Sequence, residues 1–226
     1  EKKPSHADTV TLSENDVKQL QQWFQSCEAG KQATEREPLL EVKNLSFGYT
    51  KGQQTLQNVS LTIRKGEMVS IVGKNGAGKS TFSKLVCGFE DPDQGEIRFD
   101  GRDLLTENIR HRAKHIGYVM QNPDSQIVTD KVWHELAFGL ESLGYDQKTI
   151  RLRVAEMASY FGIEHWFYKN VSELSGGQKQ LLNLASVMAM QPEVLILDEP
   201  TSQLDPIAAA DFLNTVKKIN RELRTT

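Results

Sequence analysis

A glycine-rich segment between residues 73 and 80 has the composition and spacing of a phosphate-binding loop. It reads Gly73-Lys74-Asn75-Gly76-Ala77-Gly78-Lys79-Ser80. Glycines let the backbone curl so that several N–H groups point at phosphate oxygens, and the positive end of a following helix dipole adds to that attraction. We therefore predict that this loop binds ATP or GTP, that Lys79 contacts the β- and γ-phosphates, and that Ser80 binds Mg²⁺.

Two acidic residues follow a short apolar run near the end of the chain. The run is Val194 to Leu197, and the acids are Asp198 and Glu199. In nucleotide hydrolases with a phosphate loop, a strand-end aspartate helps to hold Mg²⁺. A neighbouring glutamate is suited to polarise the attacking water as a general base. The alternative is a solvated acidic turn before Pro200, and the phosphate loop earlier in the chain makes that alternative the weaker one.

The composition is that of an ordinary globular protein. Of its 226 residues 38% are apolar and 25% are charged, and the formal net charge of -3 with a pI near 6.0 gives no basic surface for nucleic acid. The longest uncharged run, 180–192, is too short for a membrane span of ~20 residues. No signal-peptide pattern is present at the N-terminus. Cys27 and Cys87 are far apart and predict separate thiols in a reducing, cytosolic compartment.

The elements around these residues predict an α/β fold. An apolar run over 68–72 is typical of a buried strand that leads into the loop, and a helix is expected over 80–88. Because the loop lies between strand and helix, a chance glycine-rich turn is disfavoured. Further strands are expected over 40–42, 59–63, 95–100, 115–120 and 194–197, and helices over about 130–142, 147–161, 176–190 and 206–220. Strands that flank a helical block predict a parallel-sheet core with a helical insertion.

Residues 1–38 have the character of an N-terminal extension. Ser13 is a plausible helix start, and the apolar residues that follow share one face at helical spacing: Val17, Leu20, Phe24 and Cys27. A polar and charged linker is expected over 31–38. The sequence assigns no function to this extension, and the main domain is predicted to begin at residue 39.

A second motif, Leu174-Ser175-Gly176-Gly177-Gln178-Lys179-Gln180, resembles the LSGGQ signature of ABC ATPases. The resemblance covers about residues 39–226. It implies a P-loop NTPase core with a parallel sheet, an antiparallel β subdomain and a helical subdomain over about 122–190. It also implies that two such domains meet head to tail and that each signature, Ser175 to Gln178, faces the γ-phosphate bound by the partner, again through backbone N–H groups and a helix dipole.

Other positions are similar to further motifs of that family. Tyr49 resembles the aromatic residue that stacks on adenine, and Gln121 resembles the glutamine that contacts Mg²⁺ or the attacking water. Residues 202–205 resemble the D-loop, with Gln203 where alanine is commoner, and Asp205 is included among the nucleotide-binding residues. The resemblance extends nucleotide binding to Thr81, beside Ser80. ATP and Mg²⁺ are therefore the implied cofactors.

The sequence from Gln121 onward is similar to that of the ATPase subunits of energy-coupling factor importers of the cobalt and vitamin type. The segments that carry this similarity are 121–128, 135–139 and 201–206, the last also typical of relatives with two such domains in one polypeptide. The resemblance implies an ATPase that powers transport through a separate integral membrane subunit and lies peripherally on the cytoplasmic face of the membrane. The second ATPase domain would be a copy, a homologue or a tandem repeat.

The family's switch histidine has no counterpart among these residues. In the family it lies on a strand shortly after the helix that is expected to end near Asn220, and His165 and the other histidines are elsewhere. We therefore expect a truncated domain in which nucleotide binding survives better than turnover. Two alternatives remain: a soluble ABC ATPase of the translation or DNA-repair type, and a non-catalytic nucleotide sensor. The short spacing from Lys79 to Ser175 leaves no room for the long coiled coil of repair proteins.

Overall fold

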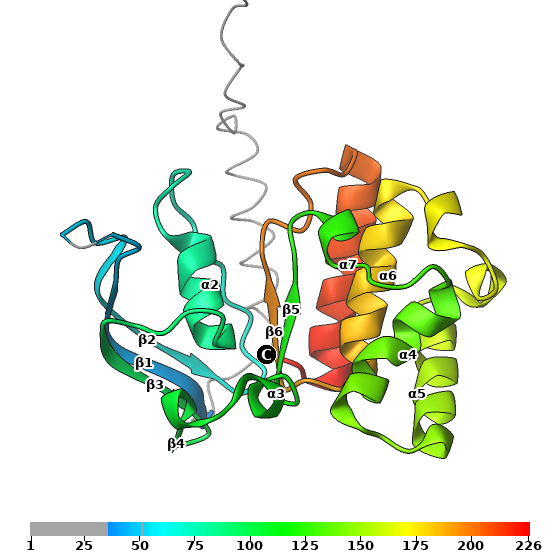
Figure 1. The fold of residues 1–226 in the computed structure, drawn as a ribbon. Helices are drawn as coiled ribbons and strands as arrows, with labels where there is room; N and C mark the ends of the chain where they lie inside the picture. Colours follow the sequence, from blue (N-terminus) through cyan, green and yellow to red (C-terminus); the bar gives the residue numbers. More distant parts are fainter. Residues whose placement is uncertain (1–35, 51) are drawn as a thin grey trace, which may run out of the picture. The chain divides into compact units, whose positions relative to one another are not determined.

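A computed structural model describes residues 36–50 and 52–226. The helix that is expected after Ser13 lies outside the described residues, as does Cys27. All elements with described bounds belong to the unit Glu37–Thr226 (Figure 1). Among the described helices, none is long and apolar enough to cross a membrane.

An antiparallel sheet forms the first half of this unit. Its strands are β1 (Pro38–Phe47), β2 (Leu56–Arg64), β3 (Gln94–Phe99) and β4 (Arg102–Asp103), in the order β2-β1-β3-β4. Alternating apolar residues of β1 and β3 give the sheet one buried face, as a half-buried strand pattern predicts. Helix α2 (Lys79–Cys87) contributes Phe82, Leu85 and Val86 to the same buried cluster. The sheet therefore supports the helix that follows the phosphate loop.

Two parallel strands, β5 (Ile116–Val119) and β6 (Val194–Leu197), lie beside α2 and form the second sheet. They pair residue for residue, from Ile116 with Val194 to Val119 with Leu197. Both strands therefore end at the same edge, where Met120 and Asp198 follow. This pairing brings the acidic pair and Gln121 to one place in the fold.

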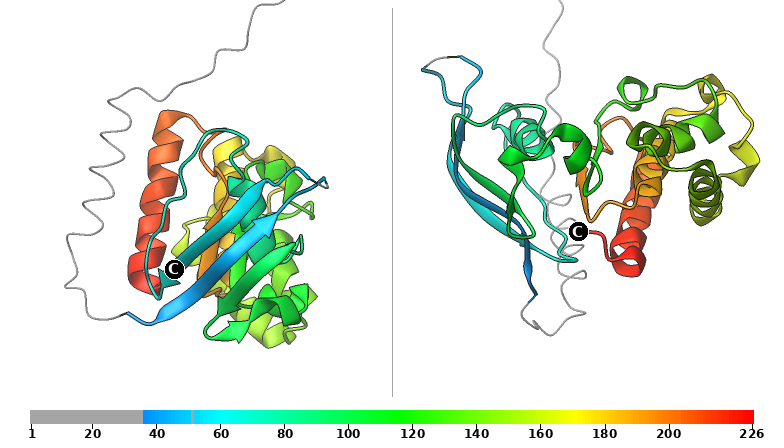
Figure 2. Two further views of the ribbon diagram at one scale, coloured as in Figure 1. Left: turned by 90° about the vertical axis from the view of Figure 1, so that its left-hand side faces the viewer. Right: turned by 60° about the horizontal axis from the view of Figure 1, so that its bottom comes forward.

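Helices cover the other side of β5 and β6, as Figure 1 and Figure 2 show. The long helices are α4 (Val132–Leu143), α5 (Gln147–Tyr160), α6 (Gly176–Ala189) and α7 (Pro206–Leu223). Shorter elements are α3 (Ile109–Arg112) and the 3-10 turns η1 (Leu104–Thr106), η2 (Pro123–Ser125), η3 (Glu164–Trp166) and η4 (Val171–Glu173). The helices share a second apolar core, in which Leu136, Leu140, Leu182 and Leu184 are fully buried. The predicted class, an α/β core with antiparallel and helical parts, is confirmed.

The prediction of a buried strand over residues 68–72 is wrong. In the part of the chain that the structure describes, this run joins no strand ladder, and Val72 is 85% exposed. A strand needs a neighbour that accepts its backbone hydrogen bonds. One edge of β6 pairs with β5. At the other edge, the backbone of Thr226 forms hydrogen bonds with the backbones of Glu193 and Leu195. The run therefore enters the phosphate loop as an extended segment without pairing.

Core packing between α4 and α6 allows a direct test of the helical fold. Leu136 is fully buried on α4, so Leu136→Ala should lower the free energy of unfolding by about 2–5 kcal/mol through lost apolar contact and a residual cavity. Denaturant unfolding measures the change. The control Leu152→Ala, on the exposed face of α5, should change it by less than about 0.5 kcal/mol. Equal effects of the two substitutions would contradict the packing.

Candidate functional site

The glycine-rich loop closes onto the start of α2 through two glycines in the left-handed region. Gly76 has φ 80° and Gly78 has φ 90°, conformations that a side chain disfavours. A Cβ at Gly78 would also lie 2.7 Å from the Leu56 side chain. Gly78 caps α2, and the first helical bond runs from Phe82 N–H to Gly78 C=O, 2.8 Å. The N–H groups of the first turn have no intrahelical partner and can bind an anion.

The Lys79 ammonium lies across this loop. Its Nζ donates to the carbonyl oxygens of Gly73 at 3.0 Å and Lys74 at 3.3 Å, and it is 3.6 Å from Glu199 Oε1. Two carbonyls on the loop therefore hold the lysine side chain over the glycines. A positive charge in that position is suited to contact the phosphates of a nucleotide.

Ser80 and Asp198 meet although 118 residues separate them. The Ser80 hydroxyl donates to Asp198 Oδ1 at 2.9 Å, and Asp198 N–H donates to Val119 C=O at 3.0 Å. Hydroxyl and carboxylate oxygens are ligands that Mg²⁺ prefers. Within the described residues, no group of three or more His, Cys, Asp or Glu side chains could hold a metal by itself. The hydroxyl and the carboxylate of this pair could hold a Mg²⁺ ion together with water and phosphate oxygens.

Glu199 is held between the lysine and Gln121. Gln121 Nε2 donates to Glu199 Oε2 at 3.2 Å and to Ser202 Oγ at 3.3 Å. The Glu199 backbone has φ 44°, which is uncommon for a residue with a side chain and costs on the order of 1–2 kcal/mol. This turn directs a partly exposed carboxylate to the mouth of the loop, where it could accept a proton from water.

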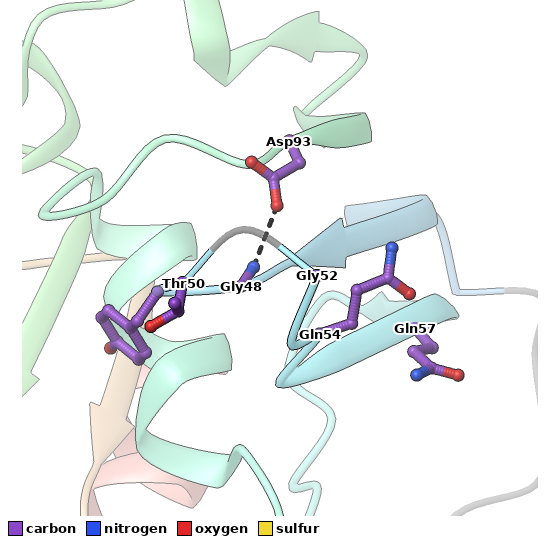
Figure 3. A pocket seen from close by; sticks show the side chains of 7 residues that line it. Gly48, Thr50, Gly52, Gln54, Gln57 and Asp93 are labelled. Carbon is purple, nitrogen blue, oxygen red and sulfur yellow. Dashed lines mark hydrogen bonds between the residues drawn. The ribbon is translucent and has the colours of Figure 1, made fainter.

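Tyr49 lies at the tip of the hairpin between β1 and β2, with its ring edge against Phe47 at a centroid distance of 4.9 Å. The ring is 56% exposed, and it lines a shallow hollow of about 560 Å³ together with Gln54, Gln57 and Asp93 among others. Figure 3 shows this hollow and the hydrogen bond from Gly48 N–H to Asp93, 2.9 Å. An exposed flat ring of this kind could stack on a base.

The signature residues form a tight helix start. Ser175 caps α6: its hydroxyl accepts from Gln178 N–H at 3.3 Å, and Gln178 Oε1 accepts from Ser175 N–H at 2.9 Å. Gly176 and Gly177 form the first two helical positions and carry no side chain. Within residues 36–50 and 52–226, no hydrogen bond or ion pair joins 175–178 to the phosphate loop. The structure does not bring these two predicted parts of the site together within one chain.

Two further predicted residues have local structural roles. The Asp205 carboxylate caps α7 by accepting from the N–H groups of Ile207 and Ala208, both at 3.0 Å. Thr81 is buried on α2, so at Thr81 the backbone N–H of the first helical turn is the group suited to a phosphate.

Sequence reasoning missed the polar side chains that hold the segment after β5 against α6. Gln180 Nε2 donates to Met120 C=O at 3.2 Å, and Asn183 Nδ2 donates to Pro123 C=O at 3.1 Å. Lys179 Nζ lies 2.7 Å from Asp124 Oδ1. These bonds tie the loop that carries Gln121 to the helix that begins at the signature. Polar residues on the buried face of a helix would indicate such contacts. The sequence does not reveal which face of this helix is buried, so it could not identify them.

Tyr118 was also missed. Its hydroxyl donates to Asp198 Oδ2 at 2.9 Å. Burial is the main cause that raises the pKa of this hydroxyl well above its usual value, and the hydrogen bond to Asp198 is the second cause. Nothing local in the sequence identifies this contact, because it joins residues 80 positions apart and depends on the register of β5 against β6.

Two protein-family models match this chain. Residues 56–202 match the model of the family described as ABC transporter. Residues 1–47 match a family described as ATP-binding cassette cobalt transporter, so the N-terminal extension also has a counterpart among transport ATPases.

Individual relatives are also described as ATP-binding proteins of ABC transporters. The chain is 46% identical over 195 residues to an ABC transporter ATP-binding protein of Bacillus anthracis, covering 82% of this chain and 34% of the relative. It is 39% identical over 215 residues to one of Clostridium perfringens, covering 95% and 38%. The chain thus spans little more than a third of the length of these curated relatives.

Solved structures have the same fold. CbiO1 from Clostridium perfringens, described as part of the ABC transporter complex CbiONQ, superposes with a TM-score of 0.77 at 35% identity over 84% of this chain and 77% of that chain. An ATP-binding cassette solved as a dimer in a post-hydrolysis state with ADP and Pi gives 0.73 at 27% identity, covering 83% and 85%.

Proposed function

Because the chain belongs to the ABC transporter family of ATP-binding proteins, we propose that it binds ATP with Mg²⁺ at residues 73–81 and hydrolyses it to power an importer of the energy-coupling factor type. One observation carries the proposal. Residues from separate parts of the chain meet at the mouth of the phosphate loop in two adjoining groups, Ser80 with Asp198, and Lys79 and Gln121 with Glu199. Such convergence is what phosphoryl transfer by positioning and electrostatics requires.

The residues divide the chemistry between them. Lys79 and the N–H groups at the start of α2 hold the phosphates and stabilise the negative charge that develops on them. Ser80 and Asp198 would hold Mg²⁺, which when bound neutralises phosphate charge. Glu199 accepts the proton of the attacking water, and Gln121, which donates to Glu199, orients that carboxylate.

A second ATPase domain completes each site in this proposal. The signature residues 175–178 expose helix N–H groups suited to an anion, yet they make no polar contact with the described phosphate loop of their own chain. A head-to-tail pair of domains would supply each loop with the partner's signature. The dimeric structure of a related cassette supports the pairing of two domains. The second domain is a further copy, a homologue or a tandem repeat in a longer polypeptide.

We also propose that these 226 residues turn ATP over slowly. The catalytic group of the family includes a histidine, and the four described histidines all lie in other surroundings. His111 and His115 pair with Glu107 and Glu193, His134 lies near Glu141, and His165 packs on Trp166. Binding should therefore be readily measured in this chain, whereas hydrolysis is better measured in the intact protein.

The helical block over 122–175 is the proposed docking surface for the membrane subunit, at the cytoplasmic face of the membrane. A hollow of about 460 Å³ is lined by Asp124, residues 127–130, residues 170–172 and Lys179. Val128 and Tyr168 are strongly exposed in this region, at 64% and 81%, and exposed apolar groups beside a hollow are typical of an interaction site. The description of CbiO1 as part of a transporter complex supports a membrane partner.

Co-purification of the intact protein with its membrane partner tests this function. We expect an integral membrane protein to be recovered, and Val128→Asp to reduce its recovery about tenfold or more because a charge would be buried in the interface. ATP binding by this variant should be unchanged.

Ile109→Asp is the control, because Ile109 is also exposed but lies on α3, outside the helical block 122–175. Its recovery of the membrane partner should match that of the unmodified protein. Failure to recover any integral membrane protein would favour a soluble ABC ATPase instead.

A further inference from the structure

The two carboxylate oxygens of Asp198 have different partners. Oδ1 accepts from the Ser80 hydroxyl at 2.9 Å, and Oδ2 accepts from the Tyr118 hydroxyl at 2.9 Å. Ser80 comes from the first turn of α2, and Tyr118 comes from β5, the strand that pairs with β6 directly before Asp198. The carboxylate is therefore held by two different elements of the fold.

The Tyr118 ring is itself fixed in place. It packs edge-on against Phe89, which follows α2, with a centroid distance of 5.7 Å. Its backbone lies in the β5–β6 ladder, where Tyr118 is the partner of Ile196. The ring is half-buried, and its hydroxyl donates to Asp198 Oδ2. Tyr118 can thus act on Asp198 only as a donor in a fixed position.

We propose that Tyr118 is a positioning residue that holds the Asp198 carboxylate in the orientation required for Mg²⁺, an inference that rests on the proposed function of the site. A carboxylate without this bond can rotate about its last side-chain torsion, which is broad. Occupation of Oδ2 by the tyrosine leaves Oδ1 beside the Ser80 hydroxyl, the other group that would hold the metal. Partners of metal ligands commonly change metal affinity by 10–100-fold when they are removed.

Tyr118→Phe removes only the hydroxyl and keeps the ring against Phe89. The experiment titrates Mg²⁺ into the full chain with a fluorescent methylanthraniloyl-ATP and also measures affinity for this nucleotide in EDTA. We expect the Mg²⁺ midpoint to rise about tenfold, while affinity in EDTA changes by less than about twofold.

Tyr160→Phe is a matched control, because the Tyr160 hydroxyl also donates to a carboxylate, Glu222 Oε2 at 3.1 Å, but between α5 and α7. Its Mg²⁺ midpoint should equal that of the unmodified chain. In an Asp198→Ala background, Tyr118→Phe should have no further effect on the midpoint, since the tyrosine acts through Asp198.

An unchanged Mg²⁺ midpoint in Tyr118→Phe would overturn the inference and leave the nucleotide site intact. An equal loss of affinity in EDTA would also overturn it, because the effect would not then pass through the metal. If the unmodified chain binds no methylanthraniloyl-ATP, or binds it without regard to Mg²⁺, the proposed function of the site fails first and the inference fails with it.

Discussion

Lys79→Ala is expected to abolish measurable ATP binding, with a loss of affinity on the order of 100-fold or more. Removal of a charge-assisted contact in a partly buried site costs about 3 kcal/mol, and about 1.4 kcal/mol corresponds to tenfold. The Lys79 side chain is 20% exposed and is already directed over the loop by the carbonyls of Gly73 and Lys74. Alanine leaves the glycine residues of the loop in place but removes the ammonium group and its two bonds to the loop carbonyls. Isothermal titration with MgATP measures the effect.

Lys84→Ala is the matched control for this prediction. Lys84 lies on the same helix, in its last turn, and takes no part in the contacts of the loop. Its removal should leave affinity for MgATP within about twofold of the original, because the charge that matters lies at the other end of the helix. Unchanged affinity in Lys79→Ala would show that the loop is not the phosphate site.

Glu199→Gln is expected to lower ATP hydrolysis by the intact protein about 10²–10⁴-fold while ATP binding is retained. Glutamine keeps the size and the possible bond to Gln121 but cannot accept a proton from water. In the proposed pair of domains reopening follows hydrolysis, so the ATP-bound pair should accumulate. Single-turnover release of phosphate measures hydrolysis. The elution volume in size-exclusion chromatography with ATP present measures the accumulation of the pair.

Glu193→Gln provides the comparison for Glu199. This carboxylate lies before β6, whereas Glu199 lies after it. Glu193 forms an ion pair with His115 at 2.9 Å, outside the phosphate loop. Hydrolysis by this variant should match that of the unmodified protein. Normal turnover by Glu199→Gln would remove Glu199 from the role of general base, while a loss of ATP binding would point to a structural role for its contact with Lys79.

The elements with strong local patterns were predicted closely. The helix expected over 147–161 is found as α5, Gln147–Tyr160, and the apolar run 194–197 is β6. The signature helix begins after Ser175, whose hydroxyl and Gln178 form a capping box. Such features depend on periodicity and on side chains within four residues of one another, so that a single sequence contains them in full.

The apolar run over 68–72 shows the limit of that reasoning. Its composition favours a strand, but the described part of the chain supplies no neighbouring strand, and Val72 is largely exposed. Strand formation depends on pairing as well as on the residues of the strand itself. The phosphate loop that follows is unaffected by this difference, because its shape depends on Gly76 and Gly78 within the loop.

The sequence by itself determined the phosphate loop, the acidic pair and the signature, and through them the family, because each is a short run whose chemistry is contained in adjacent residues. Only the tertiary structure decided which of these groups meet. It joined Ser80 to Asp198 and added Tyr118 to the same carboxylate, but it left Ser175 apart from the loop. Strand register and helix packing set such contacts between residues 80 or more positions apart, and no local pattern records them.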